Sequence, residues 1–344
     1  MNQPKLCAGA TWDATAVTFA NFSIVGDAPS GIFINKNNTI YVINWLTDYM
    51  YIWLQGSTQP DRTIYPVSDG PNSIFVRPNG SIYVDAAYSQ YQIREYKFNS
   101  SNYTILMDSC STCYGLFMDT NDVLYCSQYL KHVVLTKSFG QRMNVWQYIA
   151  GVVDSCGSAA HQLCYPRGIF VDVNFNLYIA DAGNNRIQKF APGQVNGTTV
   201  AGGSTASLTI TLATPTAVTL DADGYLFIVD QAKHRIVGSD ANGFRCIAAC
   251  AGYAGITATT LSSPPAMAFD SSGNLYVVDW GNDRIQKFAL TSNACGKYKI
   301  IEYISIYHSF ILGSNSTDST QTTTTSTSPS TVYGKMRSNT LEFA

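Results

Sequence analysis

Short apolar runs alternate with polar turns along most of this chain, and the same arrangement recurs six times. Its clearest copy is PRGIFVDVNFNLYIADAGNNRIQKF at residues 166–190, and copies begin near residues 29, 71, 113, 166, 215 and 264. The runs are rich in β-branched and aromatic residues and carry no sustained 3.6-residue stripe, so they predict strands. A recurrence every 42 to 53 residues, counted between Tyr41, Tyr83, Tyr125, Tyr178, Phe227 and Tyr276, predicts stacked or circularly arranged units.

The turns between the runs support antiparallel pairing. Pairs such as Asn79-Gly80 and Asp223-Gly224 accept the positive φ angles of tight hairpins. Two further runs in each copy complete four strands. Six units of four strands predict an all-β fold, a six-bladed β-propeller. We expect it to span residues 12–295, after an N-terminal segment at residues 1–11.

The repeated sequence pattern also resembles that of a known family. The pattern P-x-G-[apolar]-x-x-D, followed by L-Y-V-x-D-x-x-N-x-R-I, is most complete in the copies beginning at Pro166 and Pro264 and resembles the NHL repeat. The resemblance covers roughly residues 12–288. The chain is also similar to secreted rotifer NHL-repeat proteins. The first three copies depart from it, because Asn44, Ala86 and Gln128 replace the Asp at the strand end.

An Asp and an Arg recur together in the last three copies. The pairs are Asp181 and Arg186, Asp230 and Arg235, and Asp279 and Arg284. An active site rarely occurs three times in one ring. We therefore interpret these residues as structural pairs that tie strands or neighbouring blades together.

A propeller must pair its last blade with chain from the other end, because otherwise two sheet edges stay open. We expect residues 12–19 to supply the outer strand of blade six, with a Cys7–Cys295 disulfide beside it. Loop disulfides are predicted for Cys156 with Cys164, Cys110 with Cys113, and Cys246 with Cys250, the last requiring a bend. Cys126 is then the odd buried thiol.

Strand alternation sorts the loops onto two faces. Turns between strands one and two, and three and four, share one face, which holds the N-x-[S/T] sequons at Asn37, Asn79, Asn99, Asn102 and Asn196. Asn21 belongs to the other face and Asn315 to the C-terminal tail. The cysteines and sequons favour an extracellular glycoprotein whose signal peptide is absent from this sequence. A cytoplasmic protein is the alternative.

Composition excludes some partners. A formal net charge of −2 over 344 residues, with 13% charged residues, gives no footprint for nucleic acid or an acidic membrane. Residues 296–312 are apolar but too short and too interrupted to span a membrane, and their role stays open. Residues 313–344 are rich in Ser and Thr and predict a disordered tail. We expect a monomeric propeller.

Catalytic chemistry is weakly supported. His132, His161, His234 and His308 have no metal-ligand spacing, so no cofactor is expected. The NHL resemblance implies two alternatives: a lyase- or hydrolase-like enzyme with a calcium or zinc ion in the channel, and a ubiquitin-ligase adaptor that lacks its RING domain.

We favour a non-catalytic propeller that binds a protein or a glycan on the face of the strand 2–3 and strand 4–1 loops. Exposed aromatic residues are common anchors for such partners. The alternative is that these aromatic side chains pack as wedges between blades. The candidate contact residues are Trp45, Tyr49, Tyr88, Tyr129, Arg167, Asn184, His234 and Trp280.

Overall fold

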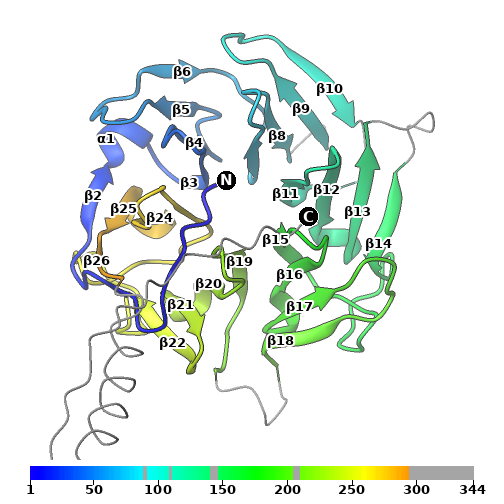
Figure 1. The fold of residues 1–344 in the computed structure, drawn as a ribbon. Coiled ribbons are helices and arrows are strands. Elements are labelled where there is room, and N and C mark those ends of the chain that lie inside the picture. Colours follow the sequence, from blue (N-terminus) through cyan, green and yellow to red (C-terminus); the bar gives the residue numbers. More distant parts are fainter. Residues whose placement is uncertain (88–90, 108–110, 140–145, 204–209, 294–344) are drawn as a thin grey trace, which may run out of the picture. The chain divides into compact units, whose positions relative to one another are not determined.

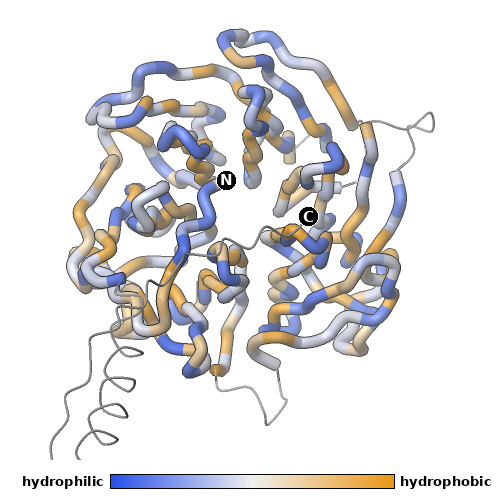
Figure 2. The backbone as a smooth tube through the Cα atoms, viewed as in Figure 1, coloured by the Kyte–Doolittle hydropathy of each residue, from blue (hydrophilic) through white to orange (hydrophobic). Residues whose placement is uncertain are grey.

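The structure, a computed structural model, describes residues 1–87, 91–107, 111–139, 146–203 and 210–293. They form six four-stranded antiparallel sheets arranged in a ring (Figure 1). The predicted six-bladed β-propeller is therefore confirmed. Apolar residues, orange in Figure 2, are distributed over all six blades and do not gather in a single layer.

The blades follow one another along the chain, and the strands of each blade are named from the centre of the ring outward. Blade one contains β3 (Pro29–Ile34), β4 (Ile40–Asn44), β5 (Met50–Trp53) and β6 (Arg62–Ile64). Blade two contains β7 (Ile74–Val76), β8 (Ile82–Ala86), β9 (Gln92–Tyr96) and β10 (Tyr103–Met107). Blade three contains β11 (Cys113–Met118), β12 (Val123–Gln128), β13 (Val133–Ser138) and β14 (Gln147–Gly151).

The second half of the ring is built in the same way. Blade four contains β15 (Pro166–Val171), β16 (Leu177–Asp181), β17 (Arg186–Phe190) and β18 (Thr198–Gly202). Blade five contains β19 (Pro215–Leu220), β20 (Leu226–Asp230), β21 (Arg235–Asp240) and β22 (Gly243–Ala248). Blade six contains β23 (Met267–Phe269), β24 (Leu275–Asp279), β25 (Arg284–Phe288) and β2 (Val17–Ala20).

Short helical turns connect some of these strands. They are α1 (Phe22–Val25), η1 (Tyr129–Lys131), η2 (Ala182–Asn184), η3 (Gln231–Lys233) and η4 (Trp280–Asn282). Within the described ranges, no helix has the length and apolar character that a membrane crossing requires.

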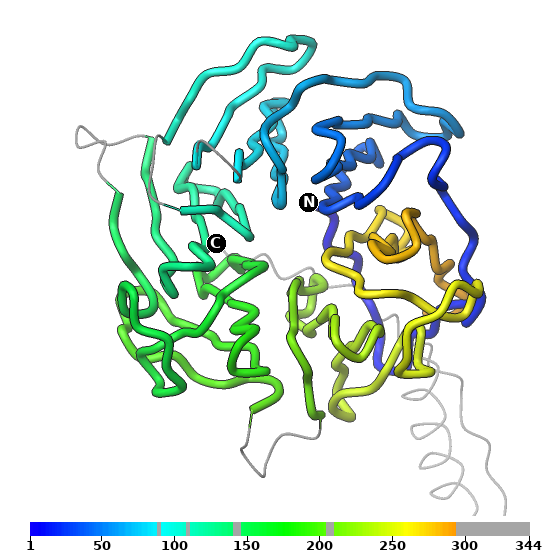
Figure 3. Tube along the Cα trace, turned by 180° about the vertical axis from the view of Figure 1, so that it is seen from behind, coloured from blue at the N-terminus to red at the C-terminus, as the bar shows by residue number. Residues whose placement is uncertain are grey.

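The ring is closed by the N-terminal strand β2, which pairs with β25 through Val17 and Lys287. In Figure 3 this blue strand runs along the outside of the orange blade. The expected closure is confirmed, but over a shorter segment than residues 12–19. Trp12 belongs instead to β1 (Thr11–Trp12), which pairs with β26 (Leu290–Ser292) in a separate two-stranded sheet.

The recurring polar residue after the first strand forms the first hairpin turn. In the blades that contain Asp119, Asp172, Asp221 and Asp270, its Oδ1 accepts hydrogen bonds from the backbone N–H groups two and four residues later. Asn35 does the same in blade one. This local bonding is the reason that Asp and Asn recur there.

Neighbouring blades pack through a row of phenylalanines on their first strands. The ring centroids of Phe33, Phe75, Phe117 and Phe170 are 5.2 Å apart at each successive contact. Such aromatic contacts each contribute about 0.5–1.5 kcal/mol beyond the area that they bury. Blades five and six carry Thr219 and Ala268 at this position instead.

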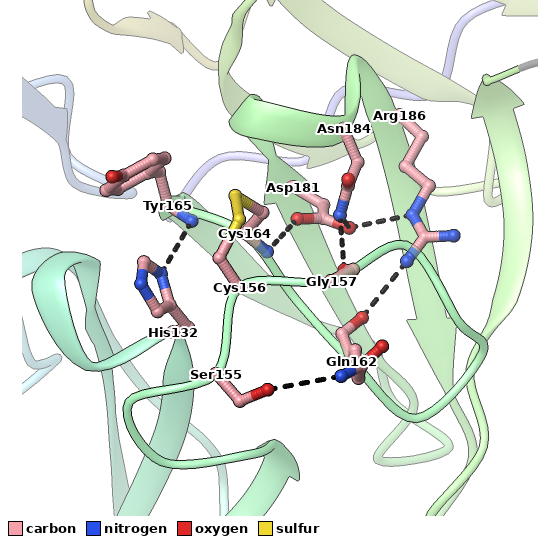
Figure 4. The surroundings of a disulfide bond; sticks show 10 residues. All are labelled: His132, Ser155, Cys156, Gly157, Gln162, Cys164, Tyr165, Asp181, Asn184 and Arg186. Carbon is pink, nitrogen blue, oxygen red and sulfur yellow. Dashed lines mark hydrogen bonds and ion pairs between the residues drawn. A yellow bond between two sulfur atoms is a disulfide. The ribbon is translucent and has the colours of Figure 1, made fainter.

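The Asp and Arg pairs hold the incoming loop onto its own blade. Asp181 Oδ2 lies 2.7 Å from Arg186 Nε, and Asp181 Oδ1 accepts the backbone N–H of Cys164 at 2.7 Å. Arg186 also donates to the carbonyls of Ser158 at 2.7 Å and Gln162 at 3.0 Å. Asp230 with Arg235 and Asp279 with Arg284 form equivalent ion pairs. The expected structural role agrees with this geometry (Figure 4).

The disulfides differ from the sequence expectation at one place. Cys156 is bonded to Cys164 and Cys246 to Cys250, as predicted. The left-handed backbone of Ala249, with φ of 52°, supplies the bend that the second pair requires.

The predicted Cys110–Cys113 bond and the free thiol at Cys126 are wrong, because Cys113 is bonded to Cys126. These residues lie on the paired strands β11 and β12, which bring their Cα atoms to 5.3 Å, within normal disulfide range. Cys110 itself lies outside the described residues.

Several other predictions concern the chain ends and loop tips. Cys7 is disulfide-bonded, but its predicted partner Cys295 lies outside the described residues, so that pairing stays a prediction. The apolar segment 296–312, the tail 313–344 and Asn315 also lie outside them. The other sequon asparagines are exposed: Asn21, Asn37, Asn79, Asn99, Asn102 and Asn196.

We predict that Asp181→Asn lowers the free energy of unfolding by about 3–5 kcal/mol, as expected when one partner of a buried ion pair is lost. Whichever way the amide turns, its NH2 group meets a donor, either Arg186 and Asn184 on one side or the backbone N–H of Cys164 on the other. Urea unfolding followed by circular dichroism measures the change.

The matched control is Lys5→Ala, which removes an ion pair to Asp223 whose side chains are 71% and 40% exposed. It should cost less than about 1 kcal/mol. Equal losses for the two variants would contradict the anchoring role of Asp181.

Candidate functional site

A cavity of about 370 Å³ lies among the inner strands of the propeller. Each of the six blades contributes three successive residues near the start of its first strand. The cavity therefore has three rings of six residues each.

The rings differ in character. We call them the upper, middle and lower rings, in chain order from the start of the strand. The upper ring is Ser30, Asn72, Tyr114, Arg167, Thr216 and Pro265. The middle ring is Gly31, Ser73, Gly115, Gly168, Ala217 and Ala266. The lower ring is Ile32, Ile74, Leu116, Ile169, Val218 and Met267.

The middle ring is made of small residues because the blades approach one another there. A Cβ atom on Gly168 would lie 2.6 Å from the carbonyl oxygen of Thr216 in the next blade. A Cβ on Gly115 would lie equally close to the carbonyl oxygen of Arg167. The G of P-x-G is therefore a packing requirement at these positions.

The entrance beside the upper ring is aromatic and carries one cation. Trp45, Gln231 and Trp280, from the strand 2–3 turns, complete its lining. Trp280 is 43% exposed, so it is not buried as a wedge between blades. The guanidinium of Arg167 lies 5.4 Å from the ring centroid of Tyr114 and 5.3 Å from that of Tyr129, within cation–π range.

The N-terminal segment contributes to the opposite end of the cavity. Met1 lines it beside Thr219, the residue that follows the lower ring in blade five. The side-chain amide of Asn2 donates to the carbonyls of Asn35 at 2.8 Å and Phe269 at 3.2 Å, and so joins blades one and six. The view in Figure 1 places the N-terminus near the centre of the ring.

A second set of polar side chains joins neighbouring blades around the ring. Each follows the strand 2–3 turn, adopts a left-handed backbone, and accepts a backbone N–H from the loop that leads into the next blade's first strand. Nδ1 of His132 accepts the N–H of Tyr165 at 3.2 Å (Figure 4). Nδ1 of His234 accepts that of Ser263 at 2.9 Å. Asn185 and Asp283 form the equivalent bonds to Thr214 and Ala28. We call these contacts the inter-blade latches.

The predicted contact residues fall into three groups. Trp45, Arg167 and Trp280 line the cavity, and Tyr129 packs against Arg167. Tyr49 stacks on Tyr51 and Tyr65 and is not part of the lining. Asn184 bonds to Gly157 and Asp181, and His234 forms a latch, so both have structural partners. Tyr88 lies outside the described residues.

Sequence reasoning missed Tyr114 and Gln231 at the entrance. Gln231 Oε1 accepts a hydrogen bond from Nη1 of Arg167 at 3.1 Å. Tyr114 stands in the same repeat column as Arg167, the x of P-x-G, and all six members of that column line the cavity. The column was visible in the sequence, although nothing there showed which way it faces.

Within the described residues, no group of three or more His, Cys, Asp or Glu side chains has the geometry to hold a metal ion. Asp85 is a buried carboxyl close to the upper ring. Its Oδ1 accepts the backbone N–H groups of Asn72 at 2.8 Å and Ser73 at 2.7 Å, and burial raises its pKa to about 7.

The family model of the NHL repeat matches residues 163–190, which contain the loop disulfide's Cys164, the Asp181–Arg186 pair and part of the cavity wall. The chain is therefore a six-bladed β-propeller in which one repeat, in blade four, matches the NHL family model. No curated protein matches it.

Solved structures share the propeller fold. A protein of unknown function from Bacteroides thetaiotaomicron is 17% identical, with a TM-score of 0.62 over 84% of this chain and 72% of that one. A streptogramin B lyase is 16% identical, with a TM-score of 0.56 over 80% of this chain and 97% of that one. An auxiliary nutrient binding protein from Bacteroides thetaiotaomicron is 13% identical, with a TM-score of 0.61 over 83% of this chain and 75% of that one. At these identities the likeness establishes the fold alone.

We predict that the latch at His132 makes the stability of the propeller depend on pH. Burial lowers the pKa of His132 below its ordinary value of 6.5, against the opposing effect of Asp154 and Asp181. The unfolded chain therefore takes up a proton at a higher pH than the folded chain. The contribution is complete above about pH 6.5 and is lost as the pH falls toward the lowered folded value.

His132→Asn should reduce this loss, because Asn185 is a natural latch with the same left-handed backbone. Urea unfolding between pH 7.5 and 5 measures it. His161→Asn, a change at an exposed histidine, is the control. An unchanged pH dependence in His132→Asn would show that the latch does not titrate.

Proposed function

We propose that this NHL propeller is a non-catalytic binding protein that recognises a protein or glycan partner on the face of the strand 2–3 and strand 4–1 loops. The observation that carries the proposal is the cavity beside Trp45, Trp280 and Arg167, which combines aromatic surface with a single cation. Its volume of about 370 Å³ lies at the lower end of the range for ligand pockets. A partner would therefore insert a small group, such as a chain end or a side branch.

The opposite face suits a different role. The sequons at Asn37 and Asn79 lie in strand 1–2 turns, and those at Asn99, Asn102 and Asn196 lie in strand 3–4 turns. Because strands of an antiparallel blade alternate in direction, these turns share one side of the ring. Sugars there would leave the entrance side free. The three disulfides whose cysteines both lie in the described residues support an extracellular location, because such bonds persist in oxidising compartments.

We predict that Trp280→Ala and Trp45→Ala each weaken partner binding by more than tenfold, as for aromatic residues at binding hot spots, which cost about 2 kcal/mol or more when truncated. The partner is first found by screening the purified chain on glycan and protein arrays. Surface plasmon resonance then measures the affinity of each variant.

Tyr148→Ala is the matched control, since Tyr148 is an aromatic residue on the outer strand β14 and is 58% exposed. It should leave binding unchanged. A fall in the unfolding midpoint of the Trp variants, with affinity retained, would instead support packing between blades.

We predict that the protein from its native source carries glycans on the sequon-rich face and a bonded Cys113–Cys126 pair. Peptide mass spectrometry under non-reducing conditions tests both features on the same sample. Unoccupied sequons together with reduced cysteines would contradict an extracellular location and favour the cytoplasmic alternative.

A further inference from the structure

Arg167 is a half-buried cation with unused hydrogen-bonding capacity. Its Nη1 donates to Gln231 Oε1 at 3.1 Å, but within the described part of the chain neither Nε nor Nη2 has an acceptor. No carboxylate among the described residues lies within ion-pair distance of it. A buried donor without an acceptor and an unpaired charge are both costly, so an acceptor that enters the cavity beside the buried Nε would stabilise this arrangement.

The surroundings hold the guanidinium in place. The rings of Tyr114 and Tyr129 are 4.6 Å apart, and both lie against it. Gln231, which accepts from Nη1, also donates to the carbonyl of Ser263 at 3.4 Å. An arginine fixed in this way is suited to pair with a planar carboxylate through two parallel hydrogen bonds.

The cavity changes character beyond this cation. The lower ring is wholly apolar, and each of its six side chains retains a small exposed fraction, between 5% and 8%. The lower ring follows the upper ring by two residues along a strand, which corresponds to roughly 6–7 Å. A ligand that spans both rings therefore has an anionic group joined to a compact apolar group at about that separation.

We propose that the cavity binds a carboxylate that carries a compact apolar side chain, the chemistry found at the C-terminus of a polypeptide. Arg167 pairs with the carboxylate, and the lower ring receives the side chain. This inference rests on the proposed binding function and narrows its partner to the end of a chain.

The test uses the full chain and a pair of probes that differ only in charge, N-acetyl-L-phenylalanine and N-acetyl-L-phenylalaninamide. Isothermal titration calorimetry measures the affinity for each. We expect the acid to bind at least about tenfold more tightly than the amide, because a charge-assisted pair with arginine is lost in the amide. Equal affinities, or no binding of either probe at millimolar concentration, would overturn the proposal without any variant.

Arg167→Thr is the matched variant, because Thr216 occupies the same column in blade five. It should bind acid and amide equally weakly. Lys5→Thr removes the same charge at a side chain 71% exposed and should retain the wild-type preference. An Arg167→Thr protein that still prefers the acid would overturn the proposal.

Two further comparisons separate the possible outcomes. A pentapeptide with a C-terminal phenylalanine that binds more tightly than N-acetyl-L-phenylalanine indicates a polypeptide end, and equal affinities indicate a small carboxylate; both support the shared chemistry. An array partner that is lost in Trp280→Ala but kept in Arg167→Thr would overturn this inference and leave the proposed function standing.

Discussion

The structure depends on closure of the ring. A four-stranded blade is too small to bury both of its faces alone, so each blade uses its neighbours as the rest of its core. Strand β2 satisfies the outer edge of β25 and joins the two ends of the propeller chain in one sheet. The closed ring leaves no room for a larger residue at Gly168, where the backbone of the next blade lies in contact. Closure also brings the six P-x-G columns around one axis, and the cavity exists only because they meet there.

The fold was predictable from sequence because its determinants are local and repeated. Asp172 and its counterparts form turns within five residues, and Asp181 pairs with Arg186 across one hairpin. Because both interactions lie within one repeat at a fixed spacing, they can be recognised in the sequence. Contacts between blades have no fixed sequence spacing. The latch from His132 to Tyr165 was therefore not predicted, nor was the direction in which Tyr114 faces. The candidate site was found only in part for the same reason. The bond from Cys113 to Cys126 lies within blade three, and it was missed because it depends on the register of β11 against β12, which shifts between Cys113 and Gly115.

Blades one to three solve the loop-anchoring problem with different chemistry. In blade one, Asn44 replaces the aspartate and donates to the carbonyls of Val25 and Asp27. In blade two, Asp85 stands one residue earlier and accepts from the incoming loop. In blade three, the buried Gln128 has no side-chain partner among the described residues, but the disulfide joins β11 to β12. The mechanical requirement is common to the blades, whereas the residues are not.

This division suggests how function is separated from architecture in a repeat protein. A residue type that recurs in one column meets a need that every blade shares, as the glycines of the middle ring and the aspartates of the first turn do. A residue type that occurs in only one blade is not explained by a structural requirement that all blades share. The six upper-ring residues all differ in type, and Arg167 and Tyr114, the charged and the aromatic member of the ring, lie against each other at the cavity. Burying Arg167 and Tyr114 costs free energy, because their polar groups lose water and some donors stay unpaired. Closure of the ring does not require this cost, since Ser30 and Thr216 occupy the same column in other blades. The departures from the repeat, more than the repeat itself, therefore mark the proposed ligand site.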